Sequence, residues 1–100
     1  KQIGTEIPSE FKLYQNYPNP FNPTTKIRFS VPPLEGDRGR NVQIIIYNVS
    51  GEEITILVND NLSPATYEAE WNASNYPSGA YYYRLTAGNY IETKKMVLVK

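Results

Sequence analysis

Apolar and polar residues alternate with a period of two through most of the chain beyond residue 25. This alternation is the pattern of β-strands that bury one face and leave the other in contact with solvent. It predicts strands around residues 26–31, 42–46, 53–58, 66–71 and 81–86. The positions expected to face the core are Ile27, Phe29, Val31, Val42, Ile44, Ile46, Ile54, Ile56, Val58, Tyr67, Ala69, Trp71, Tyr81, Tyr83 and Leu85.

The last apolar segment does not keep one parity. Ile91 and Thr93 share one set of alternate positions, whereas Met96 and Leu98 share the other. A β-bulge inserts one unpaired residue into a strand, so a bulge near residues 94 and 95 would turn both pairs toward the core. We therefore expect a sixth long strand that is bulged at its middle.

Pro18, Pro20 and Pro23 exclude a helix from residues 17–23, because each proline fixes its own φ angle and restricts the residue before it. We expect residues 13–16 to form an edge strand and the prolines to form a segment that covers a sheet edge. The alternative is that the prolines mark where a cleavable linker meets the folded domain. Residues 1–12 are expected to be a linker from an upstream passenger domain, which leaves residues 13–100 as the domain.

Turn residues separate the strands. Residues 48–51 fit a type I turn with Asn first and Gly fourth, and residues 88–89 fit a two-residue hairpin with positive φ. Residues 59–64 and 72–79 are expected to be longer loops, and residues 32–41 the most flexible connection. Six strands and an edge strand joined in this way predict an all-β sandwich of about seven antiparallel strands, with a closed barrel as the less favoured alternative.

The amino-acid composition excludes several classes of function. Ten Lys and Arg residues balance ten Asp and Glu residues, so no net charge favours nucleic acid as a partner. No apolar run approaches the roughly 20 residues that span a bilayer, so no membrane span is expected. The chain has no His and no Cys, which removes the usual general bases, nucleophiles and soft metal ligands. We expect no catalytic residues, no cofactor and no metal.

Three motifs carry more information than the composition. The first is Gln15-Asn16-Tyr17-Pro18-Asn19-Pro20-Phe21-Asn22-Pro23-Thr24-Thr25. The other two lie late in the chain. One consists of Pro77, Gly79 and Tyr81 and the other of Gly88, Lys94 and Val97, and they are followed by the basic residue Lys100. Over about residues 11–100 the chain resembles the type A C-terminal sorting domains of the bacterial type IX secretion system, which are related to the immunoglobulin-like domain of flagellar hook-cap proteins.

The resemblance implies an immunoglobulin-like β-sandwich that directs an upstream passenger protein across the outer membrane of a Gram-negative bacterium. Its implied partners are the outer-membrane translocon and a sortase that then cleaves the domain from the passenger. The implied destination is the cell surface or the extracellular space, reached through the periplasm. A cut is expected among residues 1–11 or upstream of them, where the chain is exposed.

The residues expected to take part in signal recognition are those of the late motifs: Pro77, Gly79, Tyr81, Gly88, Lys94, Lys95, Val97 and Lys100. The final strand would offer an unpaired edge for strand addition, and its lysines would favour an acidic partner. The alternative is that these lysines only protect the edge from aggregation. Tyr81 is expected to be buried, with its hydroxyl bonded to nearby backbone as a corner tyrosine.

Two other functions fit a small sandwich. A non-catalytic carbohydrate-binding module would use an aromatic platform, for which Tyr47, Tyr76, Tyr82 and Tyr90 are available. A passive spacer, or a hook-cap domain, would need no binding surface. Both remain open at the level of the sequence. Binding of soluble polysaccharides would identify the first, and the parent reading frame would distinguish the second from a terminal sorting domain.

Overall fold

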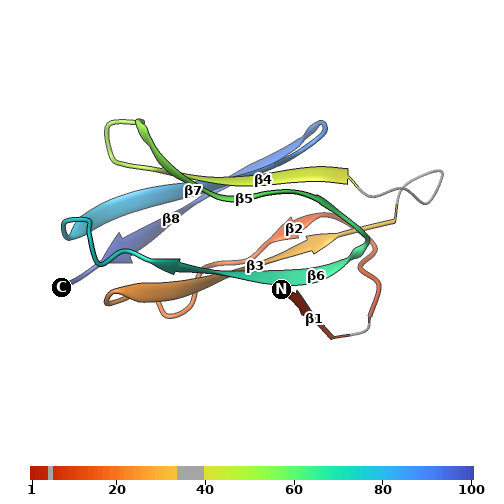
Figure 1. The fold of residues 1–100 in the computed structure, drawn as a ribbon, viewed down its shortest axis with the longest axis horizontal. Coiled ribbons are helices and arrows are strands. Elements are labelled where there is room, and N and C mark those ends of the chain that lie inside the picture. Colours follow the sequence, from red (N-terminus) through yellow and green to blue (C-terminus); the bar gives the residue numbers. More distant parts are fainter. Residues whose placement is uncertain (5, 34–39) are drawn as a thin grey trace.

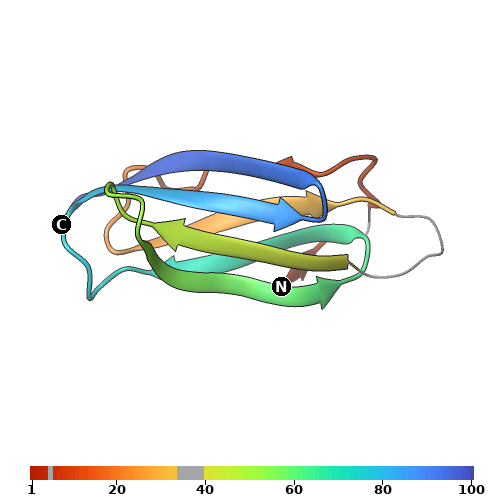
Figure 2. The same ribbon diagram turned by 90° about the horizontal axis from the view of Figure 1, so that it is seen from above.

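The computed structural model describes residues 1–4, 6–33 and 40–100 of the chain. Two antiparallel four-stranded sheets lie face to face, as Figures 1 and 2 show from two directions. The first sheet has the order β1-β6-β3-β2 and the second the order β5-β4-β7-β8. The strands are β1 (Gln2–Ile3), β2 (Lys12–Leu13), β3 (Thr24–Val31), β4 (Arg40–Tyr47), β5 (Glu53–Leu62), β6 (Ala65–Asn72), β7 (Gly79–Ala87) and β8 (Tyr90–Leu98).

The predicted immunoglobulin-like sandwich is confirmed, with eight strands in the described part of the chain rather than about seven. The additional strand is β1, a two-residue element within residues 1–12 that pairs Gln2 with Tyr67 at the edge of the first sheet. An edge strand is present but shorter than expected: β2 begins at Lys12, ends at Leu13 rather than at residue 16, and pairs with β3. The domain boundary after residue 12 stays a prediction.

Alternation along β3, β4, β6 and β7 builds the core as predicted. The buried positions come from both sheets and interdigitate between them, and each fully buried large side chain contributes roughly 1.5–3 kcal/mol to folding. The buried apolar side chains are Leu13, Phe21, Ile27, Phe29, Val31, Val42, Ile44, Ile46, Ala65, Tyr67, Trp71, Ala73, Tyr81, Tyr83, Leu85, Ala87, Met96 and Leu98.

The predicted alternation in β5 is wrong at Ile56, which is 49% exposed, whereas Leu57 and Val58 both pack against the core. The register with β4 shifts twice, so Leu57 and then Ile54 have no opposite residue. Each shift is a bulge that changes which positions face inward. Bulges therefore occur in β5, for which the sequence predicted a regular strand.

The predicted bulge in β8 is also wrong. Pairing with β7 runs without a shift from Gly79 opposite Leu98 to Ala87 opposite Tyr90. Ile91 therefore faces solvent and is 61% exposed. Regular register keeps every ladder hydrogen bond of this edge strand, and that gain outweighs burial of one isoleucine near the hairpin.

The connections agree with the sequence in part. Residues 88–89 form the two-residue hairpin, and Gly88 has φ of 61°. At residues 48–51 the amide of Gly51 donates to the carbonyl of Asn48 at 3.0 Å, as in the predicted turn. Residues 73–78 connect β6 to β7, close to the loop predicted at 72–79.

The loop predicted at residues 59–64 is wrong, because β5 continues to Leu62 and only residues 63 and 64 cross to the other sheet. The asparagines at residues 59 and 61 favour a loop in the sequence, yet Asn59 lies at an exposed position of strand β5. Its side-chain oxygen accepts hydrogen bonds from Nε2 of Gln43 at 3.4 Å and from Nδ2 of Asn41 at 3.5 Å. Of the connection predicted at residues 32–41, residues 34–39 lie outside the described part of the chain.

Candidate functional site

Most of the late-motif residues lie at the end of the sandwich where the chain terminates (Figure 1). Gly79 opens β7 opposite Leu98, near the end of β8, and Tyr81 lies opposite Met96. Val97 is beside them on β8, and Pro77 and Lys100 flank the two strands. We call this region the carboxyl-terminal end.

Gly88 is not part of this region. It lies in the β7–β8 hairpin, at the other end of both strands and next to the side chain of Arg40. Lys94 and Lys95 lie along β8 on opposite faces, because successive side chains of a strand point to opposite sides. The recognition residues predicted from sequence therefore do not form one contiguous cluster.

Tyr81 is the corner tyrosine that the sequence predicts. Its side chain is 4% exposed, and its hydroxyl donates to the carbonyl of Pro77 at 2.6 Å. Its ring meets that of Trp71 edge-on, with centroids 5.4 Å apart. Burial raises the pKa of the Tyr81 hydroxyl, and the neighbouring Tyr76 raises it further. The bond therefore holds the loop before β7 against the core.

Lys100 is tied to the same loop. Its backbone amide donates to the hydroxyl of Ser78 at 3.0 Å, and its Nζ donates to the carbonyl of Ser74 at 2.6 Å. Its charge therefore lies beside the loop between β6 and β7, away from the ladder of β8.

The outer edge of β8 is paired at this end, which corrects the expectation of an unpaired final strand. The amide of Val97 donates to Oδ1 of Asn19 at 3.0 Å, and its carbonyl accepts from the amide of Phe21 at 3.0 Å. The amide of Val99 then donates to the carbonyl of Phe21 at 2.9 Å. The proline-rich segment thus covers this edge, as one of its two predicted roles requires.

A buried polar network holds the proline-rich segment in place. Asn16 is 2% exposed, and its Nδ2 donates to the carbonyl of Pro18 at 3.1 Å and to the hydroxyl of Thr25 at 3.0 Å. The hydroxyl of Thr25 in turn donates to the carbonyl of Pro18 at 2.9 Å. Sequence reasoning assigned no role to Asn16 or Thr25. The sequence feature that could have indicated their burial is a run of polar residues inside a motif that packs against the core.

Tyr83 joins this network to the second sheet. Its hydroxyl accepts from the amide of Asn16 at 2.8 Å and donates to the carbonyl of Tyr14 at 2.8 Å. Burial raises the pKa of Tyr83 to about 12, although the bond from Asn16 opposes the shift. The sequence predicted Tyr83 as a core residue, and it did not predict this bridge.

The two lysines of β8 have different surroundings. Lys94 lies 3.5 Å from the carboxylate of Glu92, whereas Lys95 is exposed on the outer face opposite Tyr82. The pKa of Glu92 is lowered, chiefly by the hydrogen bond from the hydroxyl of Tyr90. Of these two lysines, Lys95 is therefore the one that presents its charge on the outer face of the second sheet.

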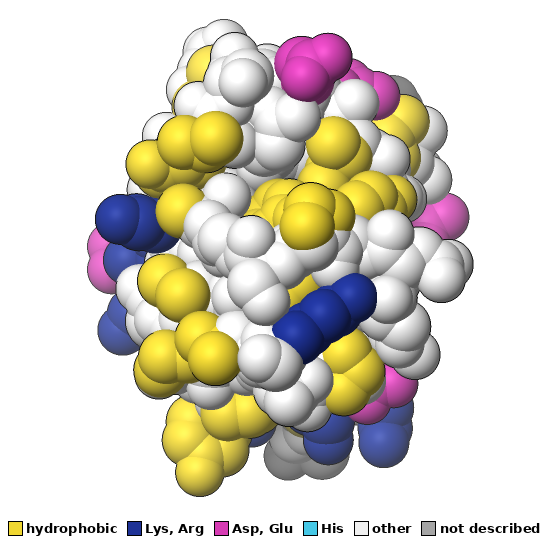
Figure 3. Space-filling view, turned by 90° about the vertical axis from the view of Figure 1, so that its left-hand side faces the viewer, with side chains coloured by type: hydrophobic (Ala, Val, Ile, Leu, Met, Phe, Trp, Pro, Cys, Tyr) yellow, Lys and Arg dark blue, Asp and Glu magenta, His cyan; other side chains and the backbone are white. Residues whose placement is uncertain are grey.

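Exposed apolar side chains gather at the carboxyl-terminal end. Val49 is 74% exposed and Val99 49%. The side chains of Pro20 and Pro77 are also exposed there. Figure 3 views this end and shows hydrophobic patches on it with a basic side chain between them. Exposed apolar patches rimmed by polar residues are typical of surfaces that bind other proteins.

The aromatic platform that a carbohydrate-binding module would need is not assembled. Tyr47 and Tyr82 are cross-strand neighbours on the outer face of the second sheet. Tyr76 instead packs on Trp71, with ring centroids 5.6 Å apart, and Tyr90 stacks on Phe11 at 5.0 Å. The four rings therefore do not share one surface.

Within residues 1–4, 6–33 and 40–100, no helix is long and apolar enough to cross a membrane. Over the same part of the chain, no three His, Cys, Asp or Glu side chains group as metal ligands would.

Comparisons with known proteins identify the family. The family model described as the secretion system C-terminal sorting domain matches residues 15–100. Among solved structures, the sensor domain of the anti-sigma factor RsgI4 of Pseudobacteroides cellulosolvens is similar, with a TM-score of 0.59 and 16% sequence identity over 90% of this chain and 95% of that one. This likeness concerns the fold alone. No curated protein gave a match. Since the family match takes in both the proline-rich motif and the late motifs, the chain belongs to the C-terminal sorting domains of type IX secretion.

Proposed function

We propose that this domain directs an upstream passenger protein out of a Gram-negative cell, and that the secretion machinery binds it as a folded surface at the carboxyl-terminal end. The observation that carries the sorting role is the family match over residues 15–100. In this proposal the outer-membrane translocon is the direct partner, and the passenger is carried to the cell surface or beyond.

Two features support binding as a folded surface. The end of β8 is part of the core, since Met96 is fully buried and Leu98 is 1% exposed. The motif residues around it are held by hydrogen bonds to one another, as Tyr81 is to Pro77 and Val97 is to Asn19. A surface fixed in this way is organised before binding and loses little conformational entropy in the complex.

Cleavage by a sortase belongs to the same proposal, with the cut among residues 1–11 or upstream. The side chains of residues 6, 7, 9 and 10 are exposed, and Ile7 is 59% exposed. Proteases act most readily on exposed chain segments. Mass spectrometry of the exported passenger would locate the new terminus, and a passenger that still carries residues 13–100 would contradict cleavage.

The experiment fuses residues 1–100 behind a signal peptide and a fluorescent reporter in a host with type IX machinery. Deleting residues 94–100 would be a poor test, because it removes Met96 and Leu98 from the core. Surface variants are sharper. Val99→Ser lies at the carboxyl-terminal end, and Ile56→Ser on β5 is a matched control, since both side chains are 49% exposed.

The parent fusion is expected in the medium or on the cell surface. Val99→Ser, alone and with Val49→Ser, is expected to lower the exported fraction, whereas Ile56→Ser leaves it unchanged. Retention of the parent fusion in the periplasm would contradict the sorting role. Equal export of all the variants would place the contact surface elsewhere, provided that urea unfolding shows each variant to be folded.

A further inference from the structure

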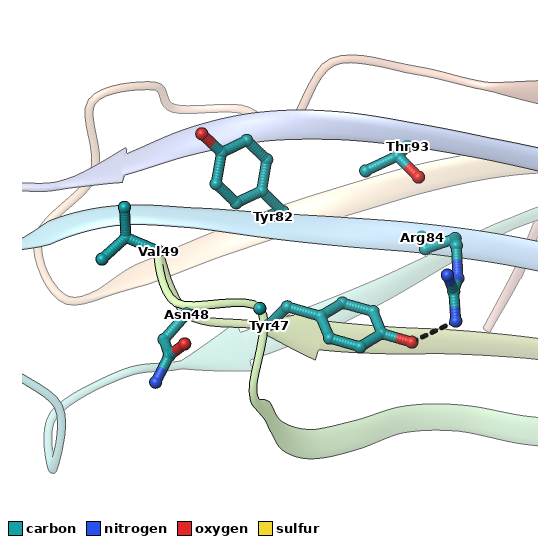
Figure 4. A pocket seen from close by; sticks show the side chains of 7 residues that line it. Tyr47, Asn48, Val49, Tyr82, Arg84 and Thr93 are labelled. Carbon is teal, nitrogen blue, oxygen red and sulfur yellow. Dashed lines mark hydrogen bonds between the residues drawn. The ribbon is translucent and has the colours of Figure 1, made fainter.

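The outer face of the second sheet carries a hollow of about 370 Å³ that the late motifs do not include (Figure 4). Its walls come from β4, β7 and β8, where Tyr47 is opposite Tyr82 and Arg84 is opposite Thr93. Val49, at the tip of the β4–β5 turn, lies at one end. The hollow therefore combines two phenol rings, an aliphatic side chain and a guanidinium group.

The turn beside the hollow is rigidly held. Oδ1 of Asn48 accepts hydrogen bonds from the amides of Ser50 at 2.9 Å and Glu52 at 3.0 Å. Its Nδ2 donates to the carboxylate of Glu52 at 2.9 Å. These bonds keep Val49 extended into solvent at 74% exposure. An apolar side chain fixed in this position is a preorganised contact for a partner.

Arg84 is the one charged side chain among the described residues that line the hollow. Its guanidinium lies over the ring of Tyr47, 4.9 Å from the centroid, and donates to the Tyr47 hydroxyl (Figure 4). Its Nε is buried and has no hydrogen-bond partner among the described residues. A guanidinium has five N–H donors, and the bond to the Tyr47 hydroxyl is the one that the Arg84 side chain makes among the described residues.

The surrounding charges favour an anion. Lys95 is exposed on the same face, opposite Tyr82. Glu92 and Lys94 lie on the other face of β8, and Glu52 is held by Asn48. Glu53, opposite Tyr47 on β5, is the remaining carboxylate near the hollow. A planar carboxylate can accept two parallel hydrogen bonds from the fork of a guanidinium, and such pairs are among the stronger hydrogen bonds in proteins.

We infer that this hollow binds the carboxylate of an Asp or Glu side chain presented by an extended segment of a protein partner. The carboxylate accepts from Arg84, and the neighbouring apolar side chains of that segment pack on Tyr82 and Val49. Aliphatic contacts suit a peptide better than a sugar, since the face of Tyr47 is already occupied by the guanidinium and is not open to stacking. Only the identity of the partner, a component of the secretion machinery, rests on the proposed function.

The test in solution titrates the 100-residue domain with a capped pentapeptide, Val-Thr-Glu-Val-Thr, and follows amide chemical shifts by NMR. The amides of Tyr82, Arg84 and Thr93 are expected to shift most. Replacing Glu by Gln in the peptide should weaken binding about tenfold or more, because an ionic hydrogen bond becomes a neutral one. Shifts that centre elsewhere, or equal binding of both peptides, would overturn the inference.

Variants of the domain sharpen this result. Arg84→Gln should abolish the preference for Glu over Gln, and Arg84→Lys should keep part of it. Arg28→Gln is the matched control, because Arg28 is also a mid-strand arginine but lies on the outer face of the other sheet, 3.6 Å from Glu68. An equal loss in Arg28→Gln would show that net charge alone is responsible. Tighter binding of an oligogalacturonate than of the Glu peptide would overturn the choice of a protein partner.

Export of the reporter fusion separates this inference from the sorting role. If the parent fusion is exported and Arg84→Gln is retained, the peptide site contacts the machinery. If both are exported while Arg84→Gln has lost peptide binding, the machinery is the wrong partner. If the parent fusion is retained, the sorting role fails, and the peptide titration alone decides whether the hollow binds carboxylates.

Discussion

The hydroxyl of Tyr83 accepts a hydrogen bond of 2.8 Å from the backbone amide of Asn16, and this bond connects the proline-rich motif to the centre of the second sheet. Tyr83 is fully buried. The proline-rich motif is therefore joined through the core to β7, the strand that also carries Gly79 and Tyr81 of the late motifs.

Tyr83 should make stability depend on pH in the alkaline range. Its pKa is about 12 in the folded domain, against 10 in the unfolded chain, because burial disfavours the phenolate. The neutral form is thus the one that folding favours, so its contribution is intact below pH 10 and is lost as the pH rises to 12. A shift of this size corresponds to roughly 2–3 kcal/mol. Tyr90, with a pKa also raised to about 12, acts in the same direction.

Urea unfolding between pH 8 and 12 measures this dependence, and ultraviolet absorbance reports tyrosine ionisation. Tyr83→Phe is expected to lower stability at pH 8, since the amide of Asn16 loses its acceptor, and to flatten the decline above pH 10. A decline of the same size in Tyr83→Phe and in the parent would assign the effect to other groups.

Tyr81→Phe tests the corner bond. It removes the donor to the carbonyl of Pro77 and leaves the ring packed on Trp71, so the free energy of unfolding should fall by about 0.5–1.5 kcal/mol. Tyr82→Phe is the control, because the adjacent Tyr82 lies on the outer face. It should change stability by no more than about 0.5 kcal/mol. Chemical denaturation of both variants gives the comparison, and equal losses would show that the bond adds nothing.

The sandwich follows from the sequence wherever one parity holds along a strand. In β4, Val42, Ile44 and Ile46 are all fully buried, as the alternation predicts. In β5 the pattern fails because bulges at Ile54 and Leu57 change the parity, and nothing local in the sequence distinguishes a bulged strand from a regular one. The register with β4 determines which side chains of β5 face the core.

The candidate site also contains one contact that the sequence predicts and one that it does not. The bond from Tyr81 to Pro77 was predictable, because both partners lie within one short turn. The pairing of Val97 with Asn19 and Phe21 was not, since it joins the two ends of the chain and depends on how the sheets pack. The family motifs include the residues of both contacts, but the motifs alone do not show which residues are bonded to each other.

Phe21→Ala should be strongly destabilising. The side chain is 2% exposed and packs against Trp71, with ring centroids 5.8 Å apart, so its truncation leaves a cavity costing about 3–5 kcal/mol. The nearby Tyr17→Ala is the control, because Tyr17 is 80% exposed. Loosening Phe21 also frees the edge of β8, and exposed edges promote association. Urea unfolding and size-exclusion chromatography measure the two effects, and a stable monomeric Phe21→Ala would show that the segment is dispensable.

Gly88→Ala should destabilise the β7–β8 hairpin by more than Gly51→Ala destabilises the β4–β5 turn. Both glycines have positive φ, 61° at Gly88 and 85° at Gly51, and a side chain there costs about 1–2 kcal/mol. At Gly51 an added Cβ meets open space, whereas at Gly88 it meets the guanidinium of Arg40, the end of a flexible side chain that can move aside at a small added cost. Displacing Arg40 also removes its contact with the ring of Phe11, 5.9 Å away. Thermal unfolding of the two variants gives the difference, and adding Arg40→Ala should remove the excess cost at Gly88. If the excess persists without Arg40, its cause lies in the backbone of the hairpin.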